Sequence, residues 1–273
     1  MRFRSAAALS LLFAAASALA APEESRKEIA DRLQRAFPSF SASEYVLGSA
    51  AFDEDLRGKI DANAEAGAAI VESGRKLWTA KFKDGSSLAR CFPNGGRRVA
   101  GNYPQYDARL KRVVTLEMAI NQCRKTHGEA IWEPADAATM GTALAYLRSL
   151  SNGQKLAVRI PAAAEVRFEQ GRRMYFTRMG QRNFACASCH LQGAGKRYDG
   201  TVLSPAIGQA THWPEIRDDA PVTLQPKIRE CLERMGAAPF PAGSEELNDL
   251  EYFLAYLSNG LPLKANVWRP GAP

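Results

Sequence analysis

The sequence predicts a mainly α-helical protein made of two tandem domains that an internal repeat relates. Two observations support this prediction. Apolar residues recur at spacings of three and four over six segments, and three landmarks of the first half return in the same order in the second half. The 273 residues are 46% hydrophobic and 24% charged, which is typical of a globular protein and excludes a disordered chain or a small disulfide-rich scaffold.

The repeat consists of three pairs of matching segments. GRKLWT at residues 74–79 resembles GRRMYFT at 171–177, and LAYL followed by SNG at 144–153 resembles the same elements at 254–260. The third pair begins at Cys123 and Cys231, each followed five residues later by a glycine. Because the order is kept while the offsets differ, we expect two related units with loops of different length. The expected domains are residues 44–158 and 159–273.

The chain opens with the pattern of an export signal. Arg2 and Arg4 form a basic start, residues 6–16 are apolar but too short to span a bilayer, and Ala18-Leu19-Ala20 matches a cleavage site. We therefore expect a signal peptide of residues 1–20, cleaved after Ala20, and a periplasmic protein with no membrane span. An N-terminal segment, residues 21–43, follows, and it is expected to contain an amphipathic helix.

Six further helices are predicted from the apolar spacing, at residues 72–82, 115–125, 136–150, 167–179, 225–235 and 244–257. The last has the clearest ends, because Ser244 precedes two acidic residues and Asn259-Gly260 is followed by Pro262. Polar loops rich in Gly and Pro separate the helices, for example residues 94–104 and 192–211. Residues 155–160 are the strand candidate.

The formal net charge is +7, and Lys and Arg are scattered along the chain with no interleaved aromatic stripe. This pattern argues against nucleic acid as a partner. It favours solubility or the steering of an anionic partner.

Cys186-Ala187-Ser188-Cys189-His190 is a Cys-x-x-Cys-His motif, the covalent attachment signature of c-type haem. Cys186 and Cys189 can reach the two vinyl groups of one macrocycle, and the adjoining His190 can bind the iron. A thioredoxin-like pair would not need the histidine, and a zinc site would need a second Cys or His pair nearby. We therefore predict a cytochrome c-like second domain with one covalently attached haem and His190 as an axial ligand.

The first domain has Cys91 where the second has this motif, and Phe92 follows instead of a histidine. It is therefore predicted to lack haem. In an oxidising compartment Cys91 and Cys123 form an even pair, so we expect a disulfide between them, with two separate buried thiols as the alternative. His127 is then expected to be a surface or packing residue.

Cys231 remains without a partner, and three uses compete: a buried apolar residue, an intermolecular disulfide, or a distal haem ligand and nucleophile. We favour the last use, because Lys227, Arg229 and Arg234 on the same helix are expected to lower the pKa of the thiol. Four other residues could be the distal ligand in its place: Met174, Met179, Met235 and His212.

At these residues the sequence resembles SoxA, the family of cytochrome subunits of the SoxAX complex in bacterial thiosulfate oxidation. The resemblance rests on residues 186–190, on LSPAIGQATHWP at 203–214, on KIREC at 227–231 and on the tandem arrangement. It covers nearly the whole mature chain. It implies the single-haem type of the family, in which a disulfide stands in for the haem of the first domain.

The resemblance implies an L-cysteine S-thiosulfotransferase that joins thiosulfate to a cysteine of the SoxYZ carrier and releases two electrons to cytochrome haem. The implied partners are the SoxX cytochrome and SoxYZ, with room for a further small subunit. Cys231 would match the catalytic cysteine, which the family carries as a haem-ligating persulfide. Lys227 stands where an Arg is usual, so Lys227 and Arg229 are the expected substrate-binding residues.

Two alternatives differ from this hypothesis in the role of Cys231. One is a non-enzymatic periplasmic c-type electron carrier with His/Met or bis-His ligation, in which Cys231 only packs. The other is a thiosulfate dehydrogenase that forms tetrathionate, which usually has a haem in each domain.

Overall fold

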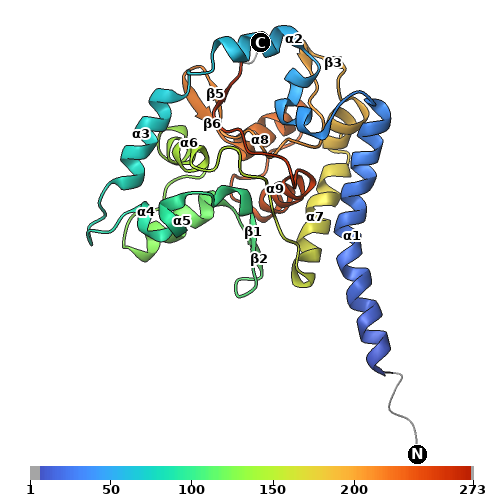
Figure 1. Ribbon diagram of the computed structural model, residues 1–273, viewed down its shortest axis with the longest axis horizontal. Coiled ribbons are helices and arrows are strands. Elements are labelled where there is room, and N and C mark those ends of the chain that lie inside the picture. Colours follow the sequence, from blue (N-terminus) through green and yellow to red (C-terminus); the bar gives the residue numbers. More distant parts are fainter. Residues whose placement is uncertain (1–6, 272–273) are drawn as a thin grey trace, which may run out of the picture.

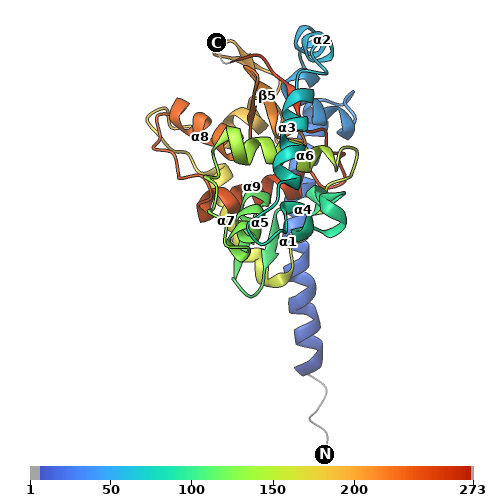
Figure 2. The same ribbon diagram turned by 90° about the vertical axis from the view of Figure 1, so that its left-hand side faces the viewer.

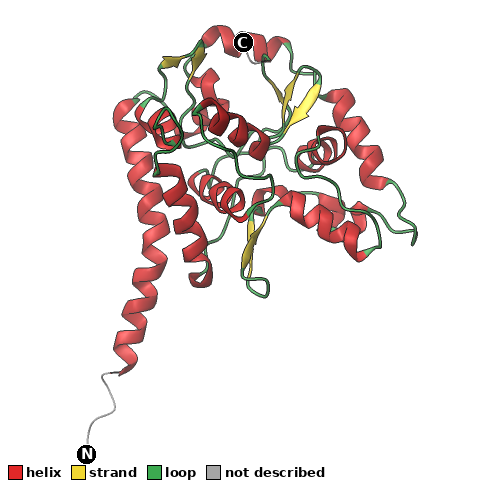
Figure 3. Cartoon of the chain, turned by 180° about the vertical axis from the view of Figure 1, so that it is seen from behind, coloured by secondary structure: helices red, strands yellow, loops and turns green. Residues whose placement is uncertain are grey.

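Two helix pairs organise the described chain, one in each half (Figure 1). The computed structural model describes the backbone of residues 7–271 and the side chains of residues 21–271. In the first half α3 (Ala68–Thr79) packs against α6 (Thr142–Ser149), and in the second half α7 (Glu165–Phe176) packs against α9 (Glu245–Leu257). Figure 3 shows that helices dominate and that strands are short.

A glycine allows each helix pair to approach closely. A Cβ atom added to Gly74 in α3 would overlap the backbone carbonyl of Thr142 in α6. A Cβ atom added to Gly171 in α7 would overlap the backbone carbonyl of Asp249 in α9 in the same way. Only glycine fits at such a contact, since any other residue would separate the helices. These glycines open the first pair of matching sequence segments.

The six helices predicted from apolar spacing are all present, with ends shifted by a few residues. The two not yet named are α5 (Leu116–Thr126) and α8 (Leu224–Arg234). The segment expected at 136–150 is divided, because a π-helical turn at Ala137–Gly141 precedes α6. α9 begins as predicted at Ser244, whose hydroxyl accepts a hydrogen bond from the backbone N–H of Leu247 at 3.3 Å.

The predicted N-terminal helix is part of α1 (Ala7–Ala36). Ile29 and Leu33 of α1 are buried, and the helix packs against α7, while its N-terminal part extends away from the remaining elements (Figure 2). The basic start of the expected signal peptide, Arg2 and Arg4, lies outside the described residues. Within the part of the chain that the structure describes, no helix has both the length and the apolar character needed to cross a bilayer.

The remaining helical pieces are short and were not predicted. They are α2 (Glu54–Ala62), α4 (Leu88–Cys91), a π-helical turn at Ser188–Gln192 and 3₁₀ segments at Ala42–Ala51, Pro93–Gly96, Ala100–Asn102 and Ala162–Ala164. Helical pieces of ten residues or fewer contain few apolar repeats, so their period is hard to recognise.

The strands form small sheets. β1 (Gln105–Asp107) pairs with β2 (Arg112–Val114), and β3 (Arg197–Tyr198) pairs with β4 (Thr201–Val202), both antiparallel. In the third sheet, β5 (Glu215–Arg217) lies between the antiparallel β6 (Ala220–Val222) and the parallel β7 (Val267–Trp268). The prediction of a strand at residues 155–160 is wrong. That segment makes only one isolated β-bridge, between Lys155 and Pro262.

One buried cluster of apolar side chains runs through both halves. It includes Trp78 and Leu147 from the first helix pair and Phe168 and Phe253 from the second. Hydrogen bonds also join the halves: the side-chain amide of Asn266 donates to the carbonyl of Ala145 at 2.9 Å. The two halves therefore share a continuous interior, which holds the elements around the site in fixed positions.

Candidate functional site

The Cys-x-x-Cys-His motif follows α7 on a helical turn whose last part, Ser188–Gln192, is π-helical. The hydroxyl of Ser188 accepts a hydrogen bond from the backbone N–H of Ala185 at 3.1 Å and so closes the start of this turn. Ala187, between the two cysteines, is buried in the core. Short π-helical segments are frequent at functional sites.

A cavity of about 500 Å³ lies beside the motif. Cys186, Cys189 and His190 line it, and so does Cys231 of α8, so the structure brings together all the residues expected to hold the haem. Much of the remaining wall is apolar and comes from α8, α9 and the segment after the motif: Val202, Leu203, Trp213, Leu224, Ile228, Leu232, Leu250 and Leu254. An apolar cavity of this volume with a few polar groups is typical of a cofactor site.

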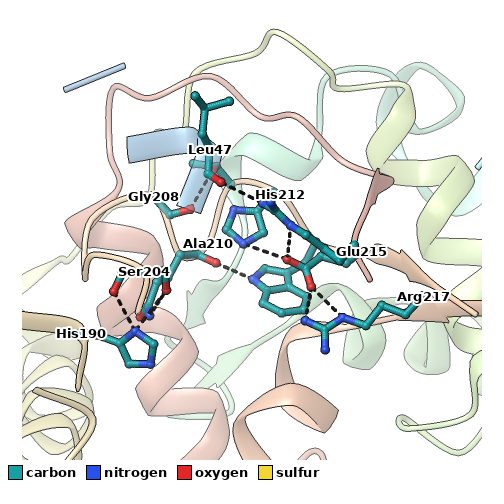
Figure 4. A network of polar contacts seen from close by, with 12 residues as sticks. Leu47, His190, Ser204, Gly208, Ala210, His212, Glu215 and Arg217 are labelled. Carbon is teal, nitrogen blue, oxygen red and sulfur yellow. Dashed lines mark hydrogen bonds and ion pairs between the residues drawn. The ribbon is translucent and has the colours of Figure 1, made fainter. Parts of the chain in front are cut away.

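His190 is oriented by its second ring nitrogen (Figure 4). Its Nδ1 lies 2.9 Å from the backbone carbonyl of Ser204 and 3.1 Å from the hydroxyl of the same residue. Because a carbonyl oxygen can only accept, Nδ1 carries the proton and Nε2 is left to bind a metal. Burial lowers the pKa of His190, which keeps the imidazole in the neutral form that ligation needs.

Cys231 lies within electrostatic range of the motif cysteines. Burial first, and the neighbouring Cys231 second, raise the pKa of Cys186 to about 12. Burial also raises the pKa of Cys231, and Lys227 and Arg234 lower it by less. The expected lowering of the pKa of Cys231 is therefore wrong, because removal of the thiol from water outweighs the cations on its helix. Coordination to a metal would remove this proton outright.

The other candidate ligands are divided between the cavity and the core. Met235 and His212 line the cavity. Met174 and Met179 pack against the core and are not among the lining residues. Burial lowers the pKa of His212 to about 4, so its imidazole is neutral, and its Nε2 lies 3.4 Å from Oε1 of Glu215.

Glu215 on β5 accepts hydrogen bonds from two arginines in the wall of the cavity (Figure 4). It accepts hydrogen bonds from Nε of Arg217 at 3.0 Å and from Nε of Arg269 at 3.0 Å. Burial acts to raise the pKa of Glu215, but His212, Arg269 and Arg217 together bring it below its ordinary value. Arg269 also donates to the carbonyl of Leu47 at 3.0 Å, and Trp213 donates to the carbonyl of Gln209.

The residues of this cavity fit a haem. Nη1 of Arg269 is buried and has no hydrogen-bond partner among the described residues, although Arg269 lines the cavity. A buried guanidinium nitrogen without an acceptor is costly, and a haem carries carboxylates that would supply one. Two thiols, an imidazole with a free Nε2 and this donor together match the attachment, ligation and carboxylate groups of the cofactor.

The structure separates the two expected substrate-binding residues. Lys227 lines the cavity, and its Nζ donates to both carboxylate oxygens of Glu230 at 2.8 Å. Arg229 is not among the lining residues. Arg217 and Arg234 line the cavity as further cations. Sequence reasoning did not assign Arg217, because β5 has three residues and nothing in its pattern links it to α8.

Cys91 and Cys123 form a disulfide that joins α4 to α5, with their Cα atoms 5.9 Å apart. The nearby ring nitrogen of His127 lies 2.6 Å from Oδ2 of Asp84 and 2.9 Å from the hydroxyl of Ser86. The two sulfurs and His127 form a tight cluster, but sulfurs bound to each other offer no thiolate to a metal. His127 packs against Phe82, in line with the expected packing role, and its hydrogen bonds were not predicted.

We expect the double variant Cys91→Ser, Cys123→Ser to lose stability without losing haem. The disulfide spans a sequence separation of 32 residues. Releasing a loop of this length from its cross-link costs about 3–4 kcal/mol in the free energy of unfolding. Urea unfolding of the holoprotein measures this loss, and the haem absorbance per chain is the internal control. An unchanged unfolding midpoint would contradict a structural role for the disulfide.

A model of the family described as "SoxA/TsdA, cytochrome c domain" matches residues 73–156 and 170–263. The chain belongs to the SoxA/TsdA cytochrome c family. Each matched range contains most of one helix pair. The prediction of a mainly helical, cytochrome c-like fold is therefore confirmed, and haem is the cofactor that a cytochrome c domain implies.

Relatives within the SoxA/TsdA family span most of the chain. The L-cysteine S-thiosulfotransferase subunit SoxA of Chlorobaculum tepidum is 39% identical over 235 residues, which cover 84% of this chain and 81% of that protein. The subunit of the same name from Allochromatium vinosum is 37% identical over 260 residues, which cover 93% and 90%. The crystal structure of SoxXA from P. pantotrophus superposes with a TM-score of 0.71 at 27% identity, covering 80% of this chain and 84% of that one.

Proposed function

We propose that this chain is the SoxA subunit of an L-cysteine S-thiosulfotransferase, which oxidatively conjugates thiosulfate to a cysteine of a carrier protein. The observation that carries the proposal is the position of Cys231 in the wall of the cavity that the haem motif also lines. The relatives from Chlorobaculum tepidum and Allochromatium vinosum are both named for this activity. Their names support an enzyme over a non-enzymatic electron carrier.

The reaction forms one sulfur–sulfur bond and releases two electrons. The carrier thiol loses its proton, its sulfur joins the terminal sulfur of thiosulfate, and the electron pair leaves to cytochrome haem. When bound, the haem supplies the one-electron redox chemistry for this step. Because one haem accepts one electron at a time, a second redox centre is needed. The SoxX cytochrome fits that need, in line with the SoxXA structure that this chain resembles.

The residues that line the cavity have different proposed roles. Cys186 and Cys189 would hold the haem covalently, and His190 and Cys231 would bind its iron. Cys231 is also the proposed catalytic residue, which contacts the sulfur of the substrate. Lys227 lies one helical turn before Cys231 on α8, so a sulfonate held by its ammonium group would lie beside the sulfur. Arg229 is not proposed as a substrate-binding residue, because it does not line the cavity.

The haem is proposed to be the only one of the chain. Residues 159–273 form the haem-binding cytochrome c domain, and residues 44–158 form a related domain in which the Cys91–Cys123 disulfide replaces the cofactor. The close contacts at Gly74 and Gly171 support the relation between the two units. The proposed mature protein is periplasmic, begins after Ala20, and has SoxX and the SoxYZ carrier as partners.

The test is a conjugation assay with purified components. The holoprotein with its SoxX partner is mixed with thiosulfate, the SoxYZ carrier and an oxidised cytochrome acceptor. We expect the carrier to gain one thiosulfate on its cysteine and the acceptor to take up two electrons per conjugate. Carrier whose cysteine is alkylated is the control. A holoprotein that exchanges electrons with the acceptor but leaves the carrier mass unchanged would support the electron-carrier alternative.

A further inference from the structure

Two cations from different elements converge on one carboxylate in the cavity wall. Nζ of Lys227 on α8 donates to Oε1 and Oε2 of Glu230 at 2.8 Å, and Nη1 of Arg217 on β5 lies 3.9 Å from Oε2. The side chains of Lys227 and Arg217 are only 20% and 17% exposed, while that of Glu230 is 35% exposed. All three residues line the cavity beside Cys231.

The guanidinium of Arg217 is divided between two carboxylates. Its Nε and Nη2 donate to Glu215, which fixes the plane of the group. Nη1, the remaining nitrogen, is the one nearest Glu230. Arg217 is therefore held in place by a buried partner and presents its third nitrogen to the same point as Lys227. It adds a second, firmly held cationic donor beside that of Lys227.

We infer that Lys227 and Arg217 form the anion-binding site for the substrate, and that Glu230 occupies this site until the substrate displaces it. The inference rests on the proposed function. A carboxylate presents two oxygens and one negative charge to the cations, much as the sulfonate end of thiosulfate does. Glu230 is the most exposed member of the group and can turn away from the cavity, whereas the cations stay in the wall.

Removing the charge of Glu230 should strengthen substrate binding. In Glu230→Gln the two cations lose their internal counter-ion and the shape of the side chain is kept. We expect the dissociation constant and the KM for thiosulfate to fall about five- to tenfold, with kcat changed by less than about twofold. Glu233→Gln, on an exposed position of the same helix that does not line the cavity, is the matched control and should leave both constants unchanged.

Arg217→Gln should have the opposite effect and raise both constants about tenfold or more, with Arg217→Lys intermediate. Because Arg217 also anchors Glu215, thermal unfolding and haem absorbance check that each variant is folded. If Arg217→Gln does not fold, the binding and KM values of Glu230→Gln alone test the inferred anion site.

Binding is measured by calorimetry of the holoprotein with thiosulfate in the absence of carrier, and turnover by the conjugation assay. Tighter thiosulfate binding and a lower KM in Glu230→Gln would support the inference. Constants equal to those of the wild type in Glu230→Gln would overturn it, even where the wild type conjugates thiosulfate normally. A wild type that binds thiosulfate without transferring it would count against the proposed function, and the binding constants would still decide the inference.

Discussion

Cys231→Ala is expected to abolish conjugation of thiosulfate to the carrier while the haem stays attached. Cys231 lines the same cavity as the haem motif and Lys227, and we propose it as the iron ligand and the residue that contacts the sulfur of the substrate. We expect the turnover rate to fall by at least about a thousandfold, since a nucleophilic or ligating thiolate has no substitute in alanine. The measurement is the conjugation assay, with the carrier followed by mass spectrometry.

Met235→Leu is the matched comparison, because Met235 lies one helical turn after Cys231 and lines the same cavity. It should keep most of the turnover and the wild-type haem spectrum. Loss of activity in Met235→Leu together with normal activity in Cys231→Ala would contradict the assignment and would move the distal ligand to the methionine.

The second large effect is on the cofactor itself. The double variant Cys186→Ala, Cys189→Ala is expected to be exported without covalently bound haem, because the two thioether bonds need both thiols. Denaturing electrophoresis followed by haem staining measures this directly, and intact mass gives the same answer. Transfer activity should be absent.

The control for this variant is Cys91→Ser with Cys123→Ser, which removes the same number of sulfurs but should stain as strongly as the wild type. Haem found covalently attached to the double variant of Cys186 and Cys189, or missing from the disulfide variant, would contradict the proposal that the chain holds one haem in its second half.

Local features of this protein were predictable from its sequence. Long helices repeat their apolar residues several times, so α5, α8 and α9 were located within a few residues. The haem motif is contained in five consecutive residues, so it can be recognised without knowledge of the fold. The disulfide followed from counting cysteines in an oxidising compartment.

Features that depend on distant parts of the chain were not predictable. β5 lies between β6 and β7, and its partner strand at Val267–Trp268 is some fifty residues away. Arg269 reaches the carbonyl of Leu47 across a sequence separation of 222 residues. The prediction for the pKa of Cys231 was wrong for the same reason, because sequence neighbours give the charges on α8 but not the burial of the thiol.

The most direct test of the central claim, that Cys231 is the sulfur ligand of the only haem and the basis of the activity, is electron paramagnetic resonance of the oxidised holoprotein. We predict one low-spin ferric haem with the signature of histidine and thiolate ligation, and loss of that signature in Cys231→Ala. A spectrum of His/Met or bis-His ligation in the wild type, unchanged in Cys231→Ala, would contradict the claim and would leave Cys231 as a packing residue.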